Sequence, residues 1–333
     1  MGAGLFLLNH WDKVKATGWG DQRIVGCLLF IVLAISASGA AYTGLQDRFA
    51  PMGMGLTLFA LYLCGRVLGK DMFLPLAIGA AVASLGVITH QVVYPGVITG
   101  GFVFEDNYDI VVGYVLLGVA LWVHKWQWIL AGLALVALLL TGSPEGVFAI
   151  GVMGIAVLWR RDWGRRLAIV LAPVVIIVVV GLALGYGQNL YGYAGKIVAG
   201  EVTSPYGDDI SKGPPRDAIA YRLAVTVDAM THVKPLGEGY NLTDFSRQPP
   251  IVHNVPLVLV QQLGYPGILA AMAWLWVSIW CLVRTKWKYL FVLIFALSLF
   301  DHFIFTQLNS VWWIAVGVAT APDSIKSDLL FRK

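Results

Sequence analysis

Long apolar stretches alternate with short polar segments along most of the chain. A helix that crosses a bilayer needs roughly 20 mostly apolar residues, because the hydrocarbon offers no water to satisfy backbone polar groups. The pattern therefore predicts about ten transmembrane helices, over residues 24–45, 52–69, 73–93, 109–124, 126–142, 145–160, 167–187, 264–283, 288–301 and 303–321. The fourth to sixth are short and closely spaced, so one of them could be re-entrant.

One long polar segment, residues 188–253, interrupts this series. It divides the chain into an N-terminal transmembrane bundle of about seven helices (1–187), a loop (188–253), and a C-terminal part (254–333) with an interfacial helix and about three transmembrane helices. The predicted fold class is an all-α polytopic membrane protein.

The charged residues between the predicted helices indicate an orientation. Basic residues gather in every second connection, namely Arg66, Lys70, Lys125, Arg160, Arg161, Arg165, Arg166, Arg284, Lys286 and Lys288, and in the tail at Lys326, Arg332 and Lys333. The other short connections hold Arg48 and the acidic residues Asp47, Glu105, Asp106, Asp109, Glu145 and Asp301. Because cytoplasmic loops are enriched in Lys and Arg, we expect cytoplasmic termini and an extracytoplasmic loop 188–253 in an inner or plasma membrane. The first helix is expected to be a retained anchor, since a cleavable signal layout is lacking.

Composition supports a membrane protein. Of the 333 residues, 58% are hydrophobic and 13% are charged, about half the charged fraction of ordinary globular chains. This argues against soluble, disordered and nucleic-acid-binding proteins. The three cysteines, Cys27, Cys64 and Cys281, lie in apolar runs, so neither a disulfide framework nor a metal knuckle is expected. Nucleotide-binding and protease motifs are also missing, so ATP-driven transport is unsupported.

Residues 216–233 of the loop have the periodicity of an amphipathic helix. Its apolar stripe is Ile219, Leu223, Val227 and Met230, and Arg216 and Arg222 flank this stripe. Such a helix would rest on the membrane surface with both guanidinium groups at headgroup depth. Two interpretations stay open: the arginines contact lipid phosphates, or they bind a substrate diphosphate.

The segment that follows contains the other polar features of this face. Pro235–Gly239 predicts a glycine-rich turn that ends the helix, and residues 248–283 carry no fixed charge. These 36 residues are too long for one perpendicular crossing. We expect a short interfacial helix from Asn254, a break at 264–267, and then the eighth transmembrane helix. His253 would precede the interfacial helix at the outer membrane surface.

Four motifs in this order carry a family resemblance: Gly101-Phe-Val-Phe-Glu-Asp-Asn107, Thr141-Gly-Ser-Pro-Glu-Gly146, Arg222 upstream of Pro235-Leu-Gly-Glu-Gly239, and His253-Asn254 followed by Leu263-Gly-Tyr-Pro-Gly267. Together they resemble the O-antigen ligase and O-antigen polymerase superfamily of polytopic, GT-C-type glycosyltransferases. The resemblance implies a GT-C-like fold that transfers a glycan from a polyprenyl-diphosphate donor to a hydroxyl acceptor at the extracytoplasmic face. It leaves ligase and polymerase open, and the acceptor could be a lipid core, a growing glycan or a protein.

The resemblance also implies roles for individual residues. A diphosphate is a good leaving group, so the reaction needs stabilisation of its growing charge and removal of the acceptor proton. His253 would be the general base, since imidazole titrates near neutral pH. Donor-binding candidates are Arg222 and Arg216, with Lys212, Arg247 and Lys196 less favoured; Asn254, Gly237 and Gly239 would support the site.

Alternatives from the residues stay open. Asp208 and Asp209 with Glu201, or Glu105, Asp106 and Asp109, could hold Mg²⁺ on the diphosphate, although we expect no metal or other cofactor. A lipid or glycan transporter or flippase is the main alternative function. It would favour ionisable residues buried at mid-membrane, and apart from the charges assigned to the connections the candidate within the predicted helices is His90, near an outer end. A scaffold subunit is the third possibility.

Overall fold

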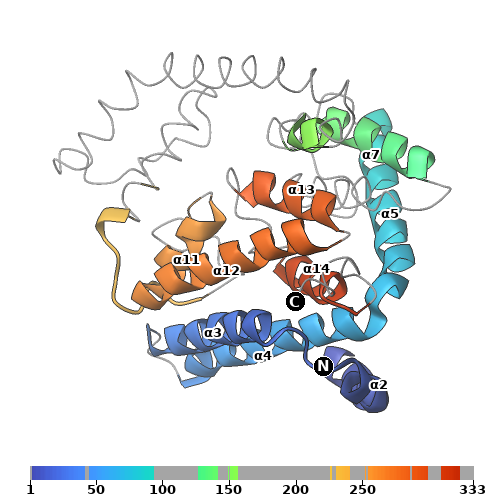
Figure 1. The fold of residues 1–333 in the computed structure, drawn as a ribbon. Coiled ribbons are helices and arrows are strands. Elements are labelled where there is room, and N and C mark those ends of the chain that lie inside the picture. The colour runs from blue at the N-terminus through green and yellow to red at the C-terminus, as the bar shows by residue number, and fades with distance from the viewer. Residues whose placement is uncertain are drawn as a thin grey trace, which may run out of the picture.

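The computed structural model describes residues 2–41, 45–93, 127–141, 149, 151–156, 226, 230–240, 252, 254–285, 287–298 and 309–322. This part of the chain is mostly helical and contains no β-strand (Figure 1). Three helices are long and apolar enough to cross a membrane, at Gln22–Ala41, Asp47–Met72 and Tyr265–Arg284. The predicted helical character is confirmed for these residues, and the three apolar helices suggest association with a membrane. The predicted helices 109–124 and 167–187 and most of the loop 188–253 lie outside them.

The described helices follow the predicted apolar stretches closely. They are α1 (Gly2–Asn9), α2 (Trp11–Thr17), α3 (Gln22–Ala37), α4 (Leu45–Leu68), α5 (Phe73–Val93), α7 (Gln127–Thr141), α11 (Val255–Leu263), α12 (Tyr265–Arg284), α13 (Lys288–Ser298) and α14 (Asn309–Ala319). Two 3₁₀ turns, η1 (Ser38–Ala41) and η2 (Gly69–Met72), extend α3 and α4.

Two differences from the sequence expectation have local causes. α4 begins at Leu45 instead of residue 52 and continues through Pro51. The proline removes only one backbone hydrogen bond from the helix. The negative charge of Asp47, in the first turn, interacts favourably with the positive N-terminal end of the helix dipole. The N-terminal segment forms α1 and α2, which the sequence analysis did not predict. Because α1 is nearly uniformly apolar, its sequence has no amphipathic periodicity.

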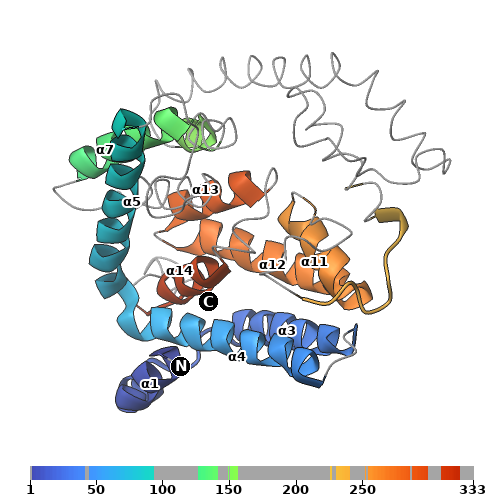
Figure 2. The ribbon, with the colours of Figure 1, turned by 180° about the vertical axis from the view of Figure 1, so that it is seen from behind.

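Helix pairs form the core of the described part. α3 packs on α4, α12 packs on α3 and α13, and α14 packs on α4. Figures 1 and 2 show α3 beside α4, with α12 and α13 stacked over them. α5 leaves the bundle after η2 and packs on α7. The largest fully buried side chains are Trp274, Trp312, Trp313, Tyr62 and Phe291.

Small residues bring α4 and α14 into close contact. A Cβ atom on Gly65 would strike the carbonyl oxygen of Ile314, and one on Gly317 would strike that of Tyr62. Glycine at such positions lets two helix backbones approach, which is typical of helix pairs in membranes.

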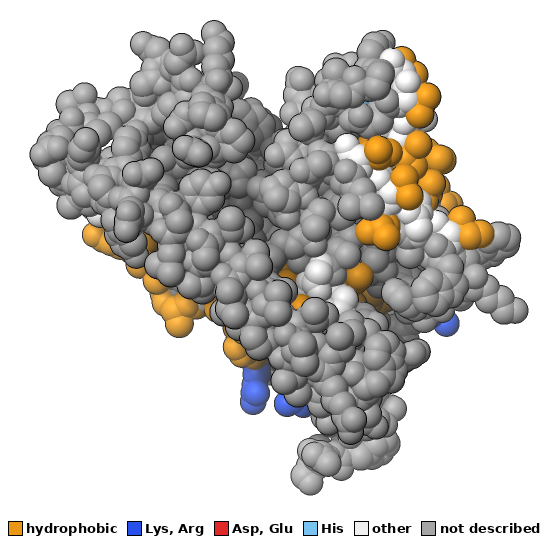
Figure 3. Space-filling view, turned by 90° about the horizontal axis from the view of Figure 1, so that it is seen from above, with side chains coloured by type: hydrophobic (Ala, Val, Ile, Leu, Met, Phe, Trp, Pro, Cys, Tyr) orange, Lys and Arg blue, Asp and Glu red, His pale blue; other side chains and the backbone are white. Residues whose placement is uncertain are grey.

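One face of α12 is apolar and exposed. The exposed residues are Tyr265, Ile268, Leu269, Met272, Trp276, Ile279 and Val283, whereas Ala270, Trp274, Val277 and Cys281 are buried on the other face. Hydrophobic side chains also gather at opposite edges of the molecule seen from above (Figure 3). A soluble protein rarely exposes apolar patches of this extent, so the faces suggest contact with a lipid bilayer.

Arg66 ties three segments together at one end of the bundle. It lies in the last turn of α4 and is only 4% exposed. Its guanidinium donates to the carbonyl oxygens of Thr17 at 2.9 Å and Gly18 at 3.3 Å, and to that of Thr320. The last carbonyls of a helix have no partner within the helix, and the five donors of arginine can satisfy several of them.

This burial corrects the sequence interpretation, which counted Arg66 as a charge in a connecting loop and found only His90 inside the predicted helices. Arg66 instead belongs to α4 and lies within the helix bundle. The backbone carbonyl groups that bind it come from distant segments of the chain, and an apolar pattern does not reveal such partners.

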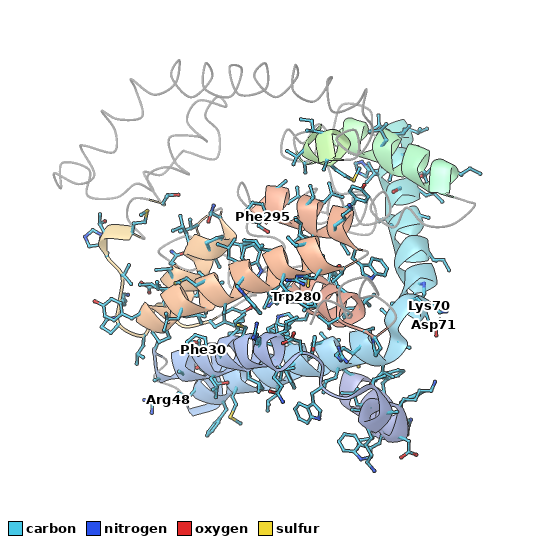
Figure 4. The ribbon with its side chains drawn as sticks, viewed as in Figure 1. Phe30, Arg48, Lys70, Asp71, Trp280 and Phe295 are labelled. Carbon is cyan, nitrogen blue, oxygen red and sulfur yellow. The ribbon has the colours of Figure 1, made fainter. Side chains whose placement is uncertain are left out.

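The contacts of Arg66 and of Ser38 distinguish the two ends of the helix bundle. Arg66 gathers the start of α3 and the ends of α4 and α14 at one end. The opposite end contains Ser38 and the beginnings of α4 and α14, with Arg48 close to Gly39. Figure 4 shows Arg48 far from Lys70 and Asp71, at the other end of α4. α3 thus runs opposite to α4 and α14 within the described bundle.

Candidate functional site

Most of the predicted site residues lie outside the described residues. These are the proposed base His253, the donor-binding candidates Arg222, Arg216, Lys212, Arg247 and Lys196, and the acidic clusters. Asn254, Gly237 and Gly239 are described. The described residues around these three form the frame of the candidate site.

Asn254 precedes the short helix α11, at the position where the sequence predicted a helix to begin. Its backbone is extended, with φ −161° and ψ 124°, and its side chain accepts a hydrogen bond from the Leu257 N–H at 3.3 Å. Pro256 stands in the first turn, where its missing N–H costs nothing. The predicted short helix after His253 is therefore confirmed, and Asn254 has a defined capping role.

Gly237 and Gly239 form a turn that docks on the end of this helix. Glu238 N–H donates to the Gln261 carbonyl at 3.0 Å, and Gly239 N–H donates to the Gln262 carbonyl at 3.1 Å. Both glycines have positive φ, +70° and +88°. A Cβ atom on Gly237 would strike the carbonyl of Gln262. The fold therefore requires glycine at position 237. The two backbone hydrogen bonds hold the turn against α11.

Gly264 completes the junction between α11 and α12. It has φ +68°, and a Cβ atom there would strike the Lys234 carbonyl. The next residue, Tyr265, donates its N–H to the Pro235 carbonyl at 3.1 Å. The predicted break before the long apolar helix is confirmed, and it lies against the glycine turn.

Tyr240 continues from the turn into the interior of the bundle. Its N–H donates to Ser38 Oγ at 3.0 Å, and its Oη accepts from Asn309 Nδ2 at 2.5 Å. Asn309 Oδ1 in turn accepts from Trp313 Nε1 at 3.1 Å. Burial raises the pKa of Tyr240, so its hydroxyl stays protonated. This network attaches the turn to α3 and α14.

The turn itself contributes little net charge. Lys234 Nζ lies 2.8 Å from the Glu238 carboxylate, and the Lys234 side chain is 59% exposed. In the described segment 230–240, Lys234 and Glu238 are the residues with a fixed charge, and these two charges offset each other. A diphosphate at this place would need cations from elsewhere in the chain, for which Arg222 and Arg216 are the candidates.

Gln261 is a polar residue of the frame that the sequence analysis did not assign. Its Oε1 accepts a hydrogen bond from the Val252 N–H at 3.0 Å, and the residue is 8% exposed. The sequence feature that could have indicated its role is a pair of glutamines in an otherwise apolar helix. For the neighbouring Gln262, Oε1 is buried and has no hydrogen-bond partner within the described part of the chain.

Among the described residues, no group of three or more His, Cys, Asp or Glu side chains is placed to hold a metal ion. The arrangement combines a rigid turn, a capped helix and a chain segment that leads into His253. The sequence matches no family model and no curated protein.

Proposed function

We propose that this protein is a membrane glycosyltransferase that moves a glycan from a polyprenyl-diphosphate donor to a hydroxyl acceptor. One observation carries the proposal: the glycine turn 235–239 is hydrogen-bonded to the end of the helix that follows His253-Asn254. Two motifs that resemble those of O-antigen ligases and polymerases thus adjoin in space. This is the relationship expected if both belong to one site.

The proposed architecture extends beyond the described residues. It has about ten transmembrane helices, cytoplasmic termini and an extracytoplasmic loop 188–253 with surface helices, in a GT-C-like arrangement. The three membrane-spanning candidates and the opposite directions of α3 and α4 support this architecture. The distribution of Lys and Arg supports its orientation.

In the proposed reaction, the acceptor hydroxyl oxygen attacks the anomeric carbon of the donor glycan. The bond from that carbon to the diphosphate oxygen breaks, and the polyprenyl diphosphate leaves with the electron pair. His253 takes the acceptor proton as general base, a contribution on the order of 10²–10⁴ in rate. Arg222 and Arg216, assisted by Lys212 or Arg247, stabilise the negative charge on the leaving diphosphate.

The testing experiment uses purified full-length protein, a polyprenyl-diphosphate glycan and a panel of hydroxyl acceptors. We expect glycan transfer, and the product size distinguishes two activities: one discrete addition indicates a ligase, and a ladder indicates a polymerase. Transfer should persist in excess chelator. Loss of activity that Mg²⁺ reverses would assign a metal role to one of the acidic clusters.

The transporter alternative predicts movement of lipid-linked glycan across vesicles without any acceptor. The buried charge of Arg66 does not favour it, because its guanidinium is bound to three backbone carbonyl groups at helix ends. Glycan movement in vesicles without transfer in the first experiment would replace the glycosyltransferase proposal.

A further inference from the structure

Gln261 connects the two motifs of the candidate site. Its side-chain Oε1 accepts from the Val252 N–H at 3.0 Å, and its backbone carbonyl accepts from the Glu238 N–H at 3.0 Å. One residue of α11 thus holds both the glycine turn and the segment that leads into His253. We infer that Gln261 is a positioning residue for the proposed base His253 and acts through its hydrogen bond to Val252. This inference rests on the proposed function.

The contact is buried on both sides. Val252 is fully buried and Gln261 is nearly so. A buried N–H group that loses its acceptor cannot turn to water, so the hydrogen bond strongly restricts the position of residue 252. The glutamine amide is neutral at any working pH, and the restriction is therefore independent of pH.

A second contact restricts the chain on the other side of His253. Asn254 caps α11 through the Leu257 N–H, and its own carbonyl accepts from the Val258 N–H at 2.9 Å. Consecutive Cα atoms are about 3.8 Å apart, so a residue between two fixed neighbours has a narrow range of backbone positions. Gln261 and the Asn254 cap thus hold the residues on both sides of position 253.

Loss of the contact between Gln261 and Val252 should affect turnover more than donor affinity. A general base must come within hydrogen-bonding reach of the acceptor hydroxyl, and a displacement of about 1 Å can cost about 100-fold in rate. The proposed donor contacts come from other parts of the chain. Loss of the Gln261 contact should therefore lower kcat and leave the donor KM nearly unchanged.

The experiment compares Gln261→Met, Gln261→Glu and Gln262→Met in the purified, full-length protein, assayed for glycan transfer well below their unfolding temperatures. Methionine has a similar length but no acceptor for Val252, and we expect kcat to fall by about 10- to 100-fold with donor KM within about twofold. Glutamate keeps an acceptor oxygen and should retain kcat within about threefold, because the hydrogen bond can still form. Gln262→Met is the matched control on the same helix and should leave both constants unchanged.

Val252→Pro removes the donor of the same hydrogen bond and should reproduce the loss of kcat, which provides a second test if Gln261→Met does not fold. The inference is overturned by normal kcat in Gln261→Met or Val252→Pro, or by equal losses in the Gln261→Met and Gln262→Met variants. Failure of the proposed function is distinguishable, since the wild-type protein itself would then transfer no glycan, whereas normal turnover in His253→Ala would remove only the base role of His253. If His253→Ala is inactive and Gln261→Met is normal, only the positioning role is wrong.

Discussion

Tyr240 and Asn309 are 69 positions apart in the sequence and share a buried hydrogen bond. The bond joins the residue that follows the glycine turn to the first residue of α14. Since α14 is in close contact with α4, the position of the turn depends on the packing of the helix bundle. The candidate site is therefore built on the helix bundle and does not depend on the loop alone.

Tyr240→Phe tests this attachment. The substitution removes the acceptor for Asn309 Nδ2 and leaves a buried amide N–H without that partner, which costs about 1 to 3 kcal/mol. We expect a lower free energy of unfolding, measured by equilibrium unfolding in mixed detergent. Tyr265→Phe is the control, because the Tyr265 side chain is exposed. Equal stability of the two variants would show that the Tyr240 hydroxyl contributes nothing.

Gly237→Ala tests the docking of the turn on α11. Alanine at φ +70° is strained, and its Cβ would strike the Gln262 carbonyl. We expect a loss of about 2 kcal/mol or more in stability, together with reduced glycan transfer. Gly26→Ala, inside α3, has open space around its Cβ and should be neutral or stabilising. A Gly237→Ala protein as stable and active as the Gly26→Ala protein would contradict the close contact.

Arg66→Met tests the junction at the opposite end. The variant leaves the carbonyl groups of Thr17, Gly18 and Thr320 without their donor, and we expect a loss of at least about 3 kcal/mol. The measurement is the midpoint of unfolding in detergent. Arg284→Met, which removes an exposed arginine from the end of α12, should change it little. A similar small change in both variants would mean that the buried guanidinium does not stabilise the bundle.

Arg222→Lys tests the proposed diphosphate contact. A lysine keeps the charge but not the planar fork that binds two phosphate oxygens, so we expect at least about a tenfold loss in kcat/KM, or about 1.4 kcal/mol. Steady-state kinetics with the lipid-linked donor measures the effect. Lys234→Arg, at a lysine already paired with Glu238, is a matched control for changes among basic residues. Full activity of Arg222→Lys would exclude a bidentate contact.

Several elements were predictable because local chemistry determines them. The apolar runs predicted α5, α7 and α12 nearly residue by residue. Asn254 and Gly264 mark the two ends of α11, one as its N-cap and the other with a positive φ. Each signal lies within a few residues of the element that it defines. The glycine-rich turn at 235–239 was predictable for the same reason, because its signal is also local.

The remaining features depend on contacts between distant segments. The burial of Arg66 requires carbonyl groups from two distant places in the chain, residues 17–18 and residue 320, and Tyr240 requires Ser38 and Asn309. Gln261 could be noticed as a polar residue in an apolar helix, but its partner Val252 has no distinctive side chain.

Glycan transfer by His253→Ala is the most direct test of the central claim, that an imidazole beside the capped helix activates the acceptor hydroxyl. The variant and the wild-type protein should be purified, matched for unfolding temperature, and assayed with polyprenyl-diphosphate glycan and acceptor. We predict a loss of about 100-fold or more in kcat with an intact fold. Near-normal turnover in the His253→Ala protein would contradict the claim.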